Sequence, residues 1–76
     1  MKIYSHSRKS NRDVETDEIT ILAAPEELRR LARFISNTAE LMQRHGPDFG
    51  HEHLQDFERT DDQRKPDVII APPSQE

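Results

Sequence analysis

The sequence predicts an α+β fold in the order ββαββ, with a single helix packed on one face of a small, mostly antiparallel four-stranded sheet. Two observations carry this prediction. Alternating residues over 17–23 pass directly into a long amphipathic segment over 25–45. A short apolar run over 67–71 is typical of a strand buried on both faces. Short connections near the C-terminal strands favour antiparallel neighbours.

The N-terminal half predicts two strands joined by a long loop. Residues 1–5 form the first strand, residues 6–16 a polar and locally basic loop, and residues 17–23 the second strand. Successive strand side chains point to opposite faces. We therefore expect Tyr4 and Leu22 on the face that the single helix leaves uncovered.

The helix is predicted over 25–45 from both its ends. Pro25 suits the first helical position and two acids follow it. Gly46 suits a left-handed cap, and Pro47 prevents continuation. At about 100° per residue, one apolar stripe forms the expected core face: Leu28, Leu31, Ala32, Ile35, Ala39 and Met42.

Phe34 and Leu41 lie beside that stripe, one heptad apart. They either widen the core face or contact a partner or a second subunit. The chain has 76 residues, 32% of them hydrophobic, and lacks cysteine, so a monomer's core is thin. This favours self-association, with Phe34, Leu41, Tyr4 and Leu22 as partner or dimer contacts, over a monomer with a mixed polar face.

The C-terminal third predicts two more strands. Residues 51–57 are interpreted as the third strand, 58–66 as a charged turn, 67–71 as the last strand and 72–76 as a flexible tail. Residues 1–71 are expected to form a single domain.

A histidine-rich segment is the candidate metal site. His51 and His53 are two residues apart, so on a strand they point the same way. Two imidazoles with Asp48 or His45 could bind a divalent transition metal. The alternative is a partly exposed strand whose histidines pack against neighbours and hydrogen-bond locally. No other cofactor is expected.

Composition weighs against several functions. The net charge of −4 argues against nucleic-acid binding, because affinity for a phosphate backbone comes mainly from basic residues. No apolar run approaches the roughly 20 residues of a membrane span, and the N-terminus lacks a signal-peptide core. With no cysteine, the chain is expected in the cytoplasm. The sequence contains no nucleophile motif or glycine-rich phosphate loop, so we expect a non-enzymatic protein.

Four short segments resemble small bacterial immunity proteins of polymorphic toxin systems, in particular the family catalogued as immunity protein thirty-two. They are Glu18-Ile19-Thr20-Ile21, Pro25 to Ala32, His51-Glu52-His53-Leu54 and Pro66 to Ile70. The resemblance implies a protein that binds and blocks a cognate toxin. It identifies no toxin-contact residue. An uncharacterised structural or interaction domain remains the other alternative, beside the metal-binding protein.

Overall fold

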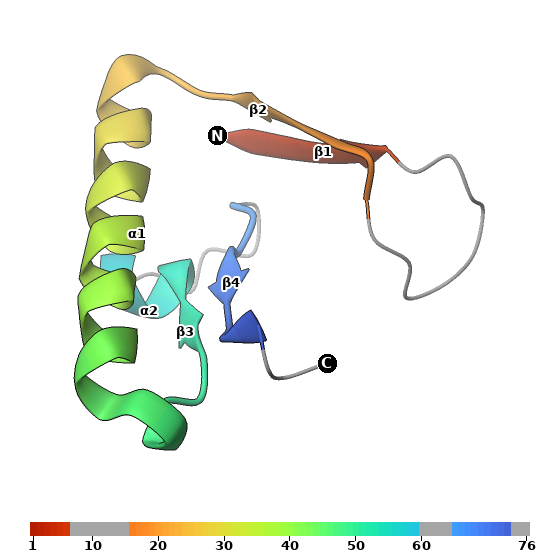
Figure 1. Ribbon diagram of the computed structural model, residues 1–76. Helices are drawn as coiled ribbons and strands as arrows, with labels where there is room; N and C mark the ends of the chain where they lie inside the picture. Colours follow the sequence, from red (N-terminus) through yellow and green to blue (C-terminus); the bar gives the residue numbers. More distant parts are fainter. Residues whose placement is uncertain (7–15, 60–64, 74–76) are drawn as a thin grey trace.

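Helix α1 (Pro25–His45) is the long element along which the rest of the chain is arranged. The computed structural model describes residues 1–6, 16–59 and 65–73 (Figure 1). Most of the predicted 6–16 loop and of the 72–76 tail lies outside them. The other elements are β1 (Lys2–His6), β2 (Glu18–Leu22), the 3-10 turn η1 (Gly46–Asp48), β3 (Glu52–His53), α2 (Leu54–Glu58) and β4 (Ile69–Ile70).

The predicted bounds of α1 are confirmed, and local chemistry explains them. Pro25 takes the first helical position after Ala24, whose backbone is extended. The Glu27 carboxylate accepts a hydrogen bond of 2.9 Å from the Ala24 N–H, which satisfies a donor at the helix start. At the other end, Gly46 has φ +56°, and its N–H donates to the Met42 carbonyl. Glycine adopts this left-handed backbone without strain.

The α+β class is confirmed, but the single four-stranded sheet is wrong. Among the described residues, β1 pairs only with β2 and β3 only with β4, both antiparallel. The predicted third strand over 51–57 stops after His53, where the chain enters α2. Leu54 and Phe57 are three residues apart, so one helical turn brings both toward α1, whereas a strand would separate them onto opposite faces.

The two halves of the molecule meet α1 at different places (Figure 1). The β1–β2 hairpin joins the N-terminal end of α1 and extends away from it. Elements β3, α2 and β4 lie beside its C-terminal half. The ring of Phe57 on α2 lies 5.5 Å from that of Phe34 on α1, which shows that the two helices are in contact.

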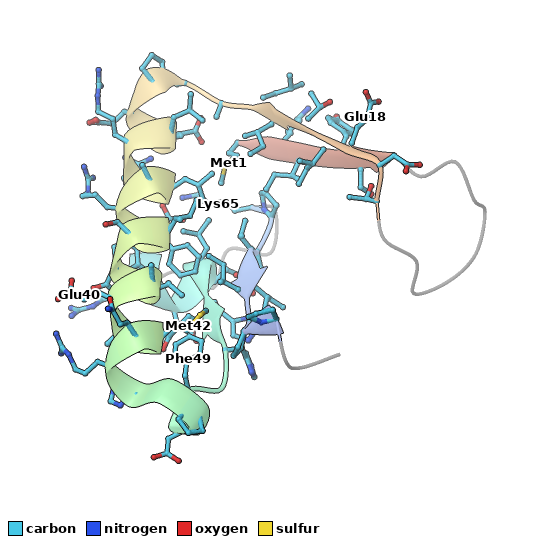
Figure 2. All side chains as sticks on the ribbon, viewed as in Figure 1. Met1, Glu18, Glu40, Met42, Phe49 and Lys65 are labelled. Atoms are coloured by element: carbon cyan, nitrogen blue, oxygen red, sulfur yellow. The ribbon has the colours of Figure 1, made fainter. Side chains whose placement is uncertain are left out.

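The core lies between α1 and α2. Leu31 and Phe34 of α1 pack with Leu54 of α2, and Met1, Val68 and Ile70 cover this cluster. Phe49 is also buried, and Figure 2 places it beside Met42 near the C-terminal end of α1.

The predicted core stripe of α1 is wrong in part, because residues at its centre are exposed. Leu31 is buried as expected, but Leu28 and Ile35 are 45% and 49% exposed. Phe34, predicted as a partner contact, is only 1% exposed and forms the core, while Leu41 is half-buried. The apolar arc of α1 is wider than the surface that α2 and β4 cover, so the helix buries only one side of that arc.

Truncating Phe34 tests this orientation of the helix. Phe34→Ala should lower the free energy of unfolding by about 3–5 kcal/mol, since it leaves a cavity in the core. The matched change Ile35→Ala, one residue along, should cost less than about 1 kcal/mol because that side chain is half exposed. Urea unfolding measures both. A larger loss for Ile35→Ala would contradict the orientation.

Thr38 is a polar residue inside this core. It is 1% exposed, and within the described residues its hydroxyl has no hydrogen-bond partner. Thr38→Val keeps the shape and replaces the hydroxyl with a methyl group, so it should raise the free energy of unfolding by about 1 kcal/mol. Thermal unfolding measures the change, with Ser36→Ala on the exposed surface as control. A loss of stability would show that the hydroxyl has a partner.

Candidate functional site

The β1–β2 hairpin exposes apolar side chains on both of its faces. Ile3 pairs with Ile21 and Ser5 with Ile19 on one face. Tyr4 pairs with Thr20 and Lys2 with Leu22 on the other. Exposure reaches 59% for Ile19 and 54% for both Tyr4 and Leu22. Tyr4 and Leu22 therefore lie at the surface, as their prediction as contact residues requires.

A second apolar surface runs along α1 and consists of Leu28, Ala32, Ile35 and Ala39, here called the α1 flank. All four are exposed, and their spacing of four, three and four residues places them on one side of the helix. They are members of the predicted core stripe. The helix presents them to solvent because α2 packs against the neighbouring face, where Leu31, Phe34 and Thr38 are buried.

The opposite, charged side of α1 is largely neutralised by ion pairs. Arg44 contacts Glu40 at 3.1 Å and Arg29 contacts Glu26 at 3.7 Å, both along the helix. Arg30 reaches Glu58 of α2 at 3.3 Å. Arginines engaged in this way are poorly placed to bind a phosphate backbone.

The N-terminus is tied to the start of α1. The Met1 ammonium contacts the second Glu27 carboxylate oxygen at 2.5 Å. Chiefly because of this hydrogen bond, the pKa of Glu27 is held below its ordinary value. The neighbouring cavity, which Met1 and Glu27 help to line, is about 20 Å³ and has room for one water.

His53 contacts Asp67 across the C-terminal segments, and the contact is an ion pair when the imidazole is protonated. Its Nδ1 lies 2.6 Å from Oδ2 of Asp67. The other Asp67 oxygen accepts a hydrogen bond of 3.0 Å from the Gln55 N–H, and the Val68 carbonyl accepts one of 2.8 Å from the Leu54 N–H. Residues 67–68 thus satisfy the first two N–H groups of α2, the task that a local N-cap usually performs.

The predicted metal site is not assembled among the described residues. His51 and His53 do lie close, with ring centroids 5.0 Å apart and an edge-on arrangement. However, within 1–6, 16–59 and 65–73, no three histidine or carboxylate side chains are grouped so that they could hold a metal ion. Asp48 and His45 therefore do not complete the pair. The alternative of local hydrogen bonding describes His53, and its acceptor Asp67 lies too far along the sequence to be singled out from spacing.

Ionisation of the His53–Asp67 pair is shifted in opposite directions. The hydrogen bond to Asp67 raises the pKa of His53 above its usual 6.5, with smaller support from nearby carboxylates. Burial raises the pKa of Asp67, but the hydrogen bonds from His53 and the Gln55 backbone outweigh it and leave the pKa below 3.8.

This pair predicts a stability maximum in mildly acidic solution. The stability that charged His53 contributes is fully present below pH 6.5 and is lost as the pH rises through the raised pKa of His53. The stability that ionised Asp67 contributes is fully present above pH 3.8 and is lost as the pH falls through the lowered pKa of Asp67. Asp67→Asn should flatten the pH dependence of urea unfolding and return the NMR-titrated pKa of His53 toward 6.5.

Asp48→Asn, in the η1 turn, is the control and should leave the pKa of His53 unchanged. A His53 pKa that is insensitive to Asp67→Asn would contradict the ion pair.

These features define a small α+β protein with two exposed apolar surfaces, an arrangement suited to binding another protein. Over residues 18–71 the chain matches the sequence model of the family described as Immunity protein 32, and it belongs to that family. The resemblance found in the sequence is thereby confirmed. The match begins at Glu18, the first residue of β2, so β1 lies outside it. No curated protein and no solved structure is significantly similar to the chain.

Among the described residues, no helix has both the length and the apolar character needed to cross a bilayer.

Proposed function

We propose that this chain is a non-enzymatic inhibitor that binds a cognate bacterial toxin in the cytoplasm and blocks its action. Membership of the Immunity protein 32 family is the observation that carries the proposal. Inhibition by binding needs an exposed surface that a partner can bury, and it needs no catalytic group.

The α1 flank is the surface that we propose for the toxin. It lies wholly within the matched residues 18–71. It belongs to a 21-residue helix that is held at both ends and packed against α2, so a partner would meet a rigid surface. Leu28 and Ile35 supply the large apolar side chains that a partner would desolvate.

Tyr4, Leu22 and Leu41 stay predicted contacts of lower rank. Tyr4 lies outside the family match, and Leu41 is half-buried in this chain. Leu22 belongs to the β1–β2 hairpin, which joins α1 at one end and extends away from it.

Co-expression in bacteria tests the function and the surface together. The chain should restore growth to cells that express a toxin gene taken from its own genomic neighbourhood, and immobilised chain should retain that toxin. Leu28→Glu combined with Ile35→Glu should abolish both effects, since it places two charges in the contact. Folding should survive because both side chains are exposed.

Asn37→Glu is the control, because Asn37 is exposed and lies on the side of α1 opposite Leu28. Absence of protection and of binding by the unaltered chain would overturn the function. Full protection by the double variant would place the toxin on another surface.

A further inference from the structure

Strand β2 presents an unprotected sheet edge. All five of its residues, Glu18 to Leu22, are exposed. Among the described residues it pairs only with β1, and a two-stranded hairpin is at best marginally stable in water. Exposed edges in proteins usually carry lysine, proline or a bulge that prevents further pairing. β2 carries none of these, and its only charge is Glu18 at one end.

We propose that β2 pairs antiparallel with β2 of a second copy of this chain, about a twofold axis through Thr20. The two hairpins then form one continuous four-stranded sheet. The inference is independent of the proposed toxin and uses a different surface from the α1 flank.

The side chains of β2 select this register. With Thr20 opposite the second copy's Thr20, Ile19 lies opposite the second copy's Ile21, and all five residues are paired. A shift of one residue would place isoleucine opposite threonine and mix the two faces. In the proposed register, Ile3, Ile19 and Ile21 of both copies share one apolar face.

Charge complementarity also identifies a second copy as the partner. Within one chain Lys2 lies opposite Leu22. In the proposed sheet Glu18 lies opposite the second copy's Leu22, so Glu18 and the second copy's Lys2 flank that leucine on the same face. Their backbones are two strand spacings, about 10 Å, apart. Long glutamate and lysine side chains can meet over this distance, and symmetry provides the contact twice.

The same two residues cannot meet within one chain. Lys2 begins β1 and is opposite the last residue of β2, whereas Glu18 begins β2. Figure 2 shows Glu18 at the end of the hairpin away from α1, and Met1 at the end next to α1. The pairing also keeps the two copies' Glu18 carboxylates at opposite ends of the new strand pair.

Cysteine cross-linking tests the axis, because the chain has no cysteine of its own. Thr20→Cys places two thiols opposite each other, where the Cα separation of roughly 4.5–5.5 Å in paired strands permits a disulfide. Mild oxidation should convert most of this variant to a species of twice 8.9 kDa. Ser36→Cys, exposed on α1, is the matched control and should cross-link only slowly.

A charge exchange tests the register. Light scattering coupled to gel filtration should give a dimer mass for the native chain. Glu18→Lys and Lys2→Glu should each raise the dissociation constant about tenfold, and the double exchange should restore it. Because the two residues are apart within one chain, recovery requires contact between copies.

A monomer mass at high micromolar concentration, with Thr20→Cys no faster to cross-link than Ser36→Cys, would overturn the proposal. A dimer would also contradict the proposal if neither single charge change alters its dissociation constant and Thr20→Cys forms no disulfide in it. The proposal would also be overturned if the chain is a monomer and an added toxin shields the Thr20→Cys thiol from oxidation. That result would assign the β2 edge to the toxin instead.

Discussion

The contact between Phe34 of α1 and Leu54 of α2 is the constraint on which the rest of the structure depends. Each side chain is 1% exposed, and together with Leu31 they form the cluster that Met1, Val68 and Ile70 cover. Burying one such side chain is worth about 1.5–3 kcal/mol. In a chain this small, a few of these contacts decide which side of a long helix faces inward, and every exposed surface follows from that choice.

Helix α2 is too short to be stable by itself, so its neighbours must satisfy its free backbone groups. Asp67 and Val68 do this from a segment beyond the end of α2, where they accept the N–H groups of Gln55 and Leu54. The same carboxylate holds His53. One residue thereby couples the start of α2, the β3–β4 pair and the ionisation of a histidine, which makes this corner of the molecule sensitive to pH.

Apolar surface left over after the core has formed supplies both of the surfaces proposed here for binding. The α1 flank and strand β2 both carry aliphatic side chains that the chain does not cover in the described structure. Their geometries differ: the α1 flank is a line of side chains on a rigid helix, whereas β2 offers backbone hydrogen-bonding groups along an edge. The proposed toxin and the proposed second copy would therefore use separate surfaces.

The sequence by itself determined the α+β class, the bounds of α1 and the family resemblance, because helix caps and periodicity are local properties. Pro25 and Gly46 act on their own backbone, whatever lies nearby. Only the tertiary structure decided which part of the apolar arc is buried. Leu28, Phe34 and Ile35 are equally suitable for a core, and the position of α2 selects Phe34. The tertiary structure also decided that residues 54–58 are helical, because the groups that stabilise α2 come from Asp67 and Val68, more than ten residues away. With α2 in place of a longer third strand, the sheet divides in two.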